Sequence, residues 1–320
     1  MTIIVCMPVT DEHKKWLYEA AGEDELIFCE QNELPEDALS RAKVIIGNPP
    51  VDCLKNANNL KLLQINSAGT GPYPALEKLQ PQAALCCATG SYGLAISEHM
   101  IGSLLMMMKN LSFYRDQQFE GKWESHGFVD AISGSRVLAL GMGDIGSAFA
   151  ERMHALGATV VGVRRNTAEV PPYCEAVYPV EKLDEILPQF DIIGMSMPET
   201  SETIGMMNEK RFSLMKDGVY IVNVGRGSAI DQDALLSAIR SGKVKGASLD
   251  VTTPEPLPAD HPLWKEPRCV ITPHISGGYR LPATHSKIIR LACRNLNALR
   301  EGRPLESQVD YATTYSRRRG

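Results

Sequence analysis

The chain has 320 residues, enough for two domains of ordinary size, and its 44% hydrophobic and 22% charged residues are typical of a globular protein. Its net charge of −5 argues against general nucleic-acid binding, which needs a basic face, and the one basic run, residues 315–320, is predicted to be a solvated tail. No apolar run approaches the roughly 20 residues that span a bilayer, and eight cysteines without CxxC spacing favour reduced thiols, a cytoplasmic location and no metal site.

Short apolar runs alternate with helical patterns along nearly the whole chain. In the first third the predicted strands are residues 2–6, 25–29, 43–47, 61–66 and 84–87. From residue 135 onward they are 135–141, 159–163, 191–197, 219–225, 246–251 and 269–274. Strands separated by helices predict parallel sheets with helices on both faces. Eleven strands are too many for one comfortable open sheet, so we expect two α/β domains.

One long helical stretch, residues 92–123, lies between the two sets of strands. Its apolar residues are dense on more than one face, which is typical of a helix buried between domains or subunits. Its three consecutive methionines are better explained as packing than as ligands. A second long helix, residues 282–302, is predicted to end at Gly302 and could return the chain to the first domain.

The sequence "GMGDIG" carries the glycine pattern of a dinucleotide site. Gly141, Gly143 and Gly146 directly follow a predicted strand and open a helix, and the strand 159–163 completes the βαβ unit. This is the context that the motif requires: a tight turn, close approach of a pyrophosphate, and close helix–strand packing. The alternative is an ordinary glycine-rich turn. The sequence contains no GxxxxGK[ST] motif, so a kinase or ATPase of the phosphate-loop type is not expected.

Two arginines follow the second strand of this unit. In dinucleotide sites an acidic residue normally occupies this place and binds the adenosine ribose. Here Arg164, Arg165 and Asn166 offer hydrogen-bond donors instead of a carboxylate, and the planar guanidinium of arginine matches the geometry of a phosphate. We therefore predict a preference for NADP, with NAD possible; the alternative is that both arginines only coat the surface.

Three polar residues follow later strands, where ligands bind in open parallel sheets. They are Arg226 in "NVGRGSAID", Glu255 in "LDVTTPEPLP" and His274 in "TPHISGG". The set suits hydride transfer at a carbonyl: a histidine exchanges the proton, a carboxylate stabilises imidazolium, and an arginine holds a substrate carboxylate. Each residue alone also has a structural explanation, since a histidine there can cap backbone and an arginine in "GRG" can bind phosphate.

These motifs, in this order and spacing, resemble the D-isomer-specific 2-hydroxyacid dehydrogenase family. The resemblance rests on "GMGDIG", "NVGRGSAIDQDALLSAIRSGKVKGASLDV", "EPLPADHPLW" and "TPHISGG" and covers nearly the whole chain. It implies an α/β fold of two Rossmann-like domains with doubly wound parallel sheets. A cofactor domain, residues 99–280, is inserted into a flavodoxin-like substrate domain made of 1–98 and 281–320. It also implies a homodimer built largely through the cofactor domains.

The resemblance also assigns roles. Arg226 would bind and polarise the 2-oxo acid, and Glu255 would pair with His274, the acid/base. Substrate binding is implied for the loop "INSAGTG" and its surroundings, namely Asn48, Ser67, Ala68, Gly69 and Tyr92, with Thr70 at its border. Cofactor binding is implied for Gly141, Gly143, Asp144, Ile145, Gly146, Arg164, Arg165, Asn166, Pro198, Val224, Asp250 and Gly277. Asp250 would accept a hydrogen bond from the carboxamide of the nicotinamide. The alternative is that it only caps its own loop.

Departures from the family pattern narrow the expected substrate. Thr252, Thr253 and Pro254 stand where the family often has a bulky or acidic pair. Glu255 disfavours formate oxidation, since formate dehydrogenases carry glutamine there, and a substrate loop without arginine disfavours phosphoglycerate. The expected function is reduction of a small 2-oxo acid, of the glyoxylate or hydroxypyruvate type, to a D-2-hydroxy acid. The alternatives are a phosphoglycerate dehydrogenase-like enzyme, a dinucleotide-sensing corepressor-type protein without turnover and, last, a methyltransferase.

Overall fold

The computed structural model describes residues 1–312 and 315–316, so most of the basic C-terminal run lies outside the described residues. The chain forms two compact units, one made of Met1–Tyr92 with Gly278–Gly320 and the other of Gly93–Gly277. The domain boundaries expected from the sequence stay predictions, because a compact unit is not by itself a functional domain. Each unit is described separately below.

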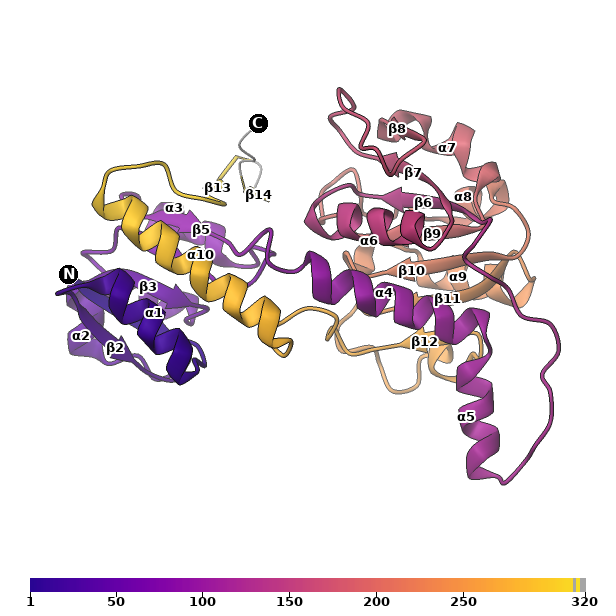
Figure 1. The fold of residues 1–320 in the computed structure, drawn as a ribbon, viewed down its shortest axis with the longest axis horizontal. Helices are drawn as coiled ribbons and strands as arrows, with labels where there is room; N and C mark the ends of the chain where they lie inside the picture. The colour runs from indigo at the N-terminus through magenta and orange to yellow at the C-terminus, as the bar shows by residue number, and fades with distance from the viewer. Residues whose placement is uncertain (313–314, 317–320) are drawn as a thin grey trace. The chain divides into compact units, whose positions relative to one another are not determined.

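The first unit is built on a five-stranded parallel sheet (Figure 1). Its strands are β1 (Thr2–Cys6), β2 (Glu25–Phe28), β3 (Ala42–Gly47), β4 (Leu62–Gln64) and β5 (Ala84–Cys86). Their order, β2-β1-β3-β4-β5, is the flavodoxin order that was expected. Its helices are α1 (Asp11–Ala21), α2 (Glu36–Arg41), α3 (Leu76–Leu79) and α10 (Pro282–Arg300).

Helix α10 is tied into the first unit by buried polar contacts. It packs along α1, and its Asn295 is fully buried. The Asn295 amide donates to Gln64 Oε1 at 2.6 Å and to the Glu306 carbonyl at 2.9 Å. Since buried amides need such partners, these bonds fix the C-terminal segment against β4.

The second unit holds a seven-stranded parallel sheet. Its strands are β6 (Arg136–Leu140), β7 (Thr159–Val163), β8 (Ala176–Tyr178), β9 (Ile192–Met195), β10 (Val219–Asn223), β11 (Val244–Leu249) and β12 (Cys269–Ile271). Their order is β12-β11-β10-β9-β6-β7-β8. β6, β7 and β8 follow one another toward one side of the sheet, and β9 to β12 follow one another toward the other, so the strand order reverses between β6 and β9. Its helices are α4 (Gly93–Met108), α5 (Leu111–Phe119), α6 (Asp144–Ala155), α7 (Leu183–Ile186), α8 (Glu209–Leu214) and α9 (Gln232–Arg240). Ligands bind at the carboxyl edge of such a sheet, beside the reversal.

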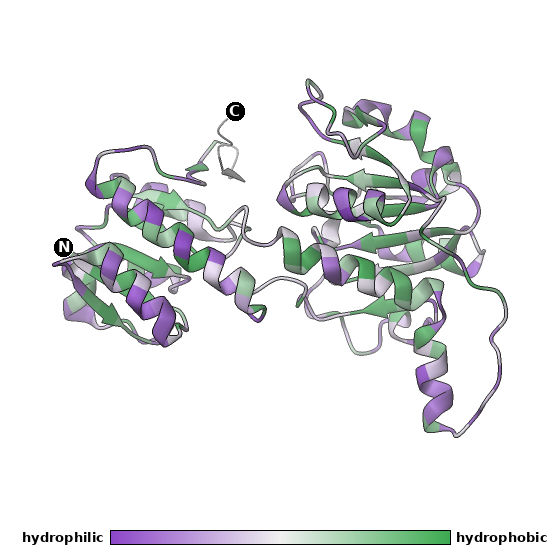
Figure 2. Ribbon diagram, viewed as in Figure 1, coloured by the Kyte–Doolittle hydropathy of each residue, from purple (hydrophilic) through white to green (hydrophobic). Residues whose placement is uncertain are grey.

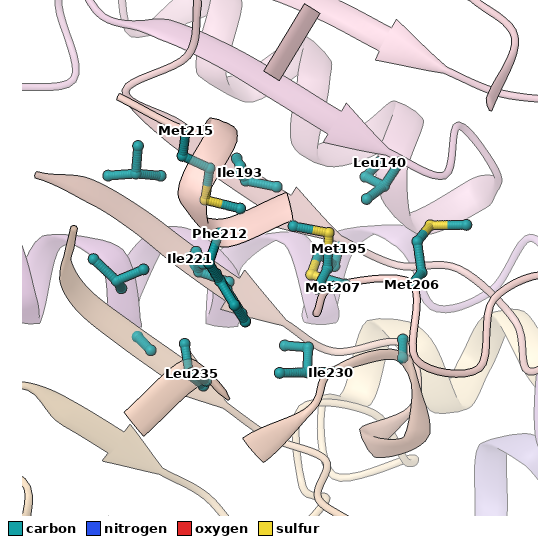
Figure 3. Close-up of a cluster of buried hydrophobic side chains, with 14 of the residues drawn as sticks. Leu140, Ile193, Met195, Met206, Met207, Phe212, Met215, Ile221, Ile230 and Leu235 are labelled. Carbon is teal, nitrogen blue, oxygen red and sulfur yellow. The ribbon is translucent and has the colours of Figure 1, made fainter. Parts of the chain in front are cut away.

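The core beneath this edge is rich in methionine (Figure 3). Met195 at the end of β9 and Met207 are fully buried and lie beside Phe212 of α8. Unbranched, polarisable methionine fills irregular space between β-branched residues such as Ile193 and Ile221. Figure 2 shows the strands of both sheets as mainly hydrophobic, as expected for sheets buried on both faces.

All eleven predicted strands are present. The described residues form three further strands, which were not predicted, and the predicted long helix is divided in two. The additional strands are β8 and the short pair β13 (Val309–Asp310) and β14 (Tyr315–Ser316). The single helix predicted over 92–123 is wrong, because α4 ends at Met108 and α5 begins at Leu111. Asn110, between them, adopts a left-handed conformation with φ 55°, which interrupts the helix. None of the helices formed by the described residues combines the length and apolarity that crossing a membrane requires.

Candidate active site

The predicted dinucleotide turn joins β6 to α6. Gly141 has φ 97°, and a Cβ atom on Gly146 would lie 1.7 Å from the Gly141 carbonyl oxygen, so only glycine permits this approach. Helix α6 starts directly after Gly143, which is exposed and supplies no side-chain cap. The N-terminal turn of α6 therefore faces the carboxyl edge of the sheet, where a helix N-terminus attracts phosphate.

Asp144, within the glycine motif, bonds to another element. Its carboxylate Oδ2 accepts from the Gly93 amide, the first residue of α4, at 3.0 Å. This contact satisfies one of the amides that a helix start leaves without an intrahelical partner. The predicted contacts of Asp144 and Ile145 with a cofactor stay predictions.

The two arginines follow β7, with different surroundings. Arg164 is half-buried: its amide donates to the Tyr178 carbonyl at 3.1 Å, and its guanidinium donates to the Glu169 carbonyl. Its Nε atom is buried and has no hydrogen-bond partner among the described residues. Arg165 and Asn166 are exposed. A buried donor without an acceptor is rare, but this nitrogen is enclosed by the protein, so a ligand meets this stretch only at the exposed parts of residues 164–166.

Arg226 is held in a narrow turn after β10, at the start of the short helix η5 (Gly227–Ala229). Asn223 closes this turn, since its Oδ1 accepts from the Gly225 amide and its Nδ2 donates to the Arg226 carbonyl, each at 3.0 Å. A Cβ atom on Gly227 would lie 2.0 Å from the Thr252 carbonyl oxygen. The "GRG" sequence thus brings Arg226 close to the loop that follows β11.

Glu255 and His274 come together from the loops after β11 and β12. Glu255 Oε2 lies 2.9 Å from His274 Nδ1, and Glu255 Oε1 accepts from the Thr252 amide at 3.1 Å. The histidine side chain is 50% exposed and the glutamate 40%. With Nδ1–H donated to Glu255, the Nε2 atom has no partner among the described residues and is free to exchange a proton with a ligand.

The other predicted cofactor residues also follow strands of this unit. Pro198, after β9, accepts from the Thr203 hydroxyl through its carbonyl, and Val224 is buried directly after β10. Asp250 is buried after β11 and accepts from the loop after β12, which is the loop-capping geometry considered above. Gly277 ends that loop. Contact of these residues with a cofactor stays a prediction.

The predicted substrate loop lies in the first unit, after β4, and is held by residues that were predicted to line a pocket. Asn48 Oδ1 accepts from the Asn66 amide at 2.9 Å, and its Nδ2 donates to Ser67 Oγ at 3.3 Å. The buried Tyr92 hydroxyl donates to the Asn66 carbonyl. Ser67 Oγ in turn donates to the Gly69 carbonyl at 2.7 Å. Asn48 and Tyr92 therefore shape this loop.

The amides of residues 67–69 make no hydrogen bond within the described part of the chain. Three successive unpaired amides are a favourable place for a carboxylate. Their role in substrate binding stays a prediction. Within residues 1–312 and 315–316, no three His, Cys, Asp or Glu side chains are grouped so as to hold a metal ion.

Comparisons with known proteins identify the family of the chain. The family model for the NAD-binding domain of D-isomer specific 2-hydroxyacid dehydrogenases matches residues 101–276. A glyoxylate/hydroxypyruvate reductase A of Citrobacter koseri is 29% identical over 88% of this chain and 90% of its own. A crystal structure of a D-isomer specific 2-hydroxyacid dehydrogenase family protein from Aeromonas salmonicida superposes with a TM-score of 0.86 at 31% identity, over 97% of this chain and 98% of that one. A further such dehydrogenase, from Xanthobacter autotrophicus in complex with NADPH and MES, gives a TM-score of 0.82 at 25% identity, over 98% and 99%.

Proposed function

The chain belongs to the D-isomer-specific 2-hydroxyacid dehydrogenase family of oxidoreductases, and on this premise we propose that it reduces a small 2-oxo acid to a D-2-hydroxy acid with NADPH. The substrate class is that of glyoxylate and hydroxypyruvate, as in the named relative from Citrobacter koseri. The observation that carries the proposal is the 2.9 Å contact between Glu255 and His274, beside the turn that bears Arg226.

Each of these three side chains has a step in the proposed reaction. Arg226 binds the substrate carboxylate and polarises the carbonyl through its guanidinium. His274, as imidazolium, donates its Nε2 proton to the oxygen that becomes the hydroxyl group. The proton on Nδ1 stays on the histidine and remains hydrogen-bonded to Glu255. Glu255 stabilises the positive charge that His274 carries before the transfer. When bound, the reduced nicotinamide supplies the hydride that goes to the carbonyl carbon.

In the first unit, we propose the loop after β4 as a place for an anionic group. The unpaired amides of residues 67–69 match an anionic group. Asn48 and Tyr92 hold this loop through their hydrogen bonds to Asn66. Replacing Tyr92 with phenylalanine removes its donor to the Asn66 carbonyl, and we expect KM for the 2-oxo acid to rise while KM for NADPH stays unchanged.

The preference for NADPH rests on the surroundings of Arg164. The glycine turn after β6 fits a dinucleotide, and Arg164, Arg165 and Asn166, one strand away, place hydrogen-bond donors at the end of β7. A 2′-phosphate is an acceptor of the right charge for an arginine side chain, which binds phosphate in a planar fork. An acidic residue, which would repel the phosphate, is absent from positions 164–166.

A kinetic panel tests the proposal. The purified protein is assayed with glyoxylate, hydroxypyruvate, pyruvate and 3-phosphohydroxypyruvate, each with NADPH and with NADH. We expect the highest kcat/KM for glyoxylate or hydroxypyruvate with NADPH. A preference for the phosphorylated acid would favour a phosphoglycerate dehydrogenase-like enzyme. Cofactor-induced stabilisation without turnover on any 2-oxo acid would favour the dinucleotide-sensing, non-catalytic alternative.

We also propose that two copies associate through the segment 109–129, an arm that leaves and re-enters the second unit. Its ends meet, since the Asp130 amide donates to the Met108 carbonyl at 3.2 Å and Lys109 Nζ donates to the Asp130 carbonyl at 2.6 Å. The arm exposes Trp123 and Phe128 completely, at 100% and 102%. Fully exposed large aromatic residues favour a protein interface.

Light scattering coupled to size exclusion tests this association. We expect a mass of twice 35.1 kDa for the parent protein, and a single-chain mass after the paired change Trp123→Ser and Phe128→Ser. A parent protein that elutes with a single-chain mass at micromolar concentration would contradict the proposal.

A further inference from the structure

Asp250 is the most enclosed carboxylate at the carboxyl edge of the second unit's sheet. Its side chain has 0% exposure, and three donors from one loop surround it. Oδ1 accepts from Thr272 Oγ1 at 2.6 Å and from the Ile275 amide at 2.9 Å, and Oδ2 accepts from the Ser276 amide at 3.0 Å. A buried carboxylate with this many donors organises the loop that supplies them.

The loop around Asp250 is the one that carries His274, and His274 has an unusual backbone. Its φ is 51°, in the left-handed region that non-glycine residues seldom adopt. Its amide donates to the Asp250 carbonyl at 2.8 Å and to the Thr272 carbonyl at 3.0 Å. A strained conformation of this kind persists only when its surroundings hold it. Asp250 supplies much of that support, through both its backbone and its side chain.

A histidine from another element completes the cluster. His99, on α4, places Nε2 3.3 Å from Thr272 Oγ1 and 3.9 Å from Asp250 Oδ1. Since the Thr272 hydroxyl gives its only proton to Asp250, it accepts from His99, which therefore carries a proton on Nε2. Among the described residues, His99 is the one basic side chain within 4.0 Å of this carboxylate.

From these contacts we infer that His99, Thr272 and Asp250 form a positioning relay for His274. The relay runs from His99 through the Thr272 hydroxyl to the Asp250 carboxylate, and it fixes the left-handed backbone of His274. That backbone directs the imidazole to Glu255 and leaves Nε2 unpaired. His99 and Thr272 are positioning residues, because neither touches the imidazole. The inference rests on the acid/base role proposed for His274 and assigns to Asp250 a task other than cofactor binding.

Two matched pairs of variants test the relay by steady-state kinetics. Thr272→Val removes the hydroxyl with little change of shape, and Thr272→Ser keeps it. His99→Leu removes the donor, and His99→Gln keeps an N–H near the position of Nε2. We expect Thr272→Val to lower kcat by about 10- to 10²-fold, because small misplacements of a reacting group cost this much. Its KM values for NADPH and the 2-oxo acid should stay within about threefold, and the serine variant should recover kcat. His99→Leu should lower kcat less, with recovery by glutamine.

A turnover-independent measurement separates this inference from the proposed function. Nitrogen NMR of histidine side chains, with His274 assigned through His274→Asn, should show a proton held on Nδ1 in the parent protein and in Thr272→Ser. In Thr272→Val the proton should exchange between the two nitrogens. If the parent protein does not reduce any 2-oxo acid but this signal still depends on Thr272, the proposed function fails and the relay stands. A Thr272→Val variant with a lower melting temperature but unchanged kcat and signal would overturn the relay. An effect confined to KM for NADPH would also overturn it and assign the cluster to the cofactor.

Discussion

Two regions at the same edge of the second unit's sheet differ in how completely their polar groups are paired. Asp250 and Glu255, in the loop after β11, form hydrogen bonds of 2.6–3.0 Å with the loop after β12, which carries His274. In the loop after β7, Arg164 leaves a buried Nε–H without a partner among the described residues. Preorganised groups lower a reaction barrier, whereas exposed donors, such as those of Arg165 and Asn166 beside Arg164, are available to a ligand. The difference supports the two proposed roles, acid–base chemistry for the first region and selection of the cofactor for the second.

The largest effect is expected from His274→Asn in the first region. Asparagine tolerates positive φ better than most residues, so the loop should keep its conformation while the acid/base is lost. We expect kcat to fall by about 10²- to 10⁴-fold, the usual size of general acid–base catalysis. The stabilisation by NADPH, measured as a shift in melting temperature, should be retained. Comparable turnover in this variant would remove His274 from the mechanism.

Glu255→Gln should have the next largest effect. Glutamine keeps the shape and removes the charge, but its single amide oxygen can accept from only one of the two groups, the Thr252 amide or His274 Nδ1, and its NH2 group faces the other. Hydrogen bonds to charged groups contribute about 1.5–3 kcal/mol, so we expect kcat/KM to fall about 10- to 10²-fold. Unchanged kcat/KM near neutral pH would show that the charge of Glu255 is not used.

Gly227→Ala tests how tightly the first region is packed. The added Cβ would lie 2.0 Å from the Thr252 carbonyl and would displace the loop that carries Glu255. Overpacking of this kind costs about 1–3 kcal/mol, which thermal unfolding can measure. The control is Gly102→Ala on α4, where the Cβ has no neighbour within 4 Å; its stability should be unchanged or higher. Equal melting temperatures for the two variants would contradict the packing argument.

Arg164→Gln sharpens the comparison from the second region. We expect the ratio of kcat/KM for NADPH over NADH to fall about tenfold, because one charge-assisted hydrogen bond is lost. kcat with NADH should stay near the parent value, since the loops after β11 and β12 are untouched. The same substitution at the exposed neighbour, Arg165→Gln, should change the ratio less, by about twofold. A parent protein that favours NADH, or a ratio unaffected by Arg164→Gln, would contradict the selection of NADPH.

The fold could be predicted largely from the sequence because buried parallel strands are continuous apolar runs. β8 was missed since it has three residues, pairs with one strand and exposes Tyr178. The break after α4 was missed because it depends on the backbone of Asn110, with no glycine or proline nearby. Residues at strand ends could be assigned from their order, since parallel strands share one carboxyl edge. The contacts of His99 with Thr272 and of Asn48 with Asn66 could not, because they depend on distances between separate elements.

The hydrogen bond that closes the base of the arm bears on which sequence changes this protein can tolerate. The chain leaves the second unit at Met108 and returns at Asp130, whose amide already bonds the Met108 carbonyl. The Asp130 carboxylate is anchored independently, by the Tyr220 hydroxyl at 2.7 Å and by Lys245 at 2.6 Å. Insertions, deletions and substitutions between these two points should therefore leave the sheet and its polar loops undisturbed (Figure 1). Sequence changes confined to the arm should therefore alter the proposed association of two copies without altering the proposed chemistry.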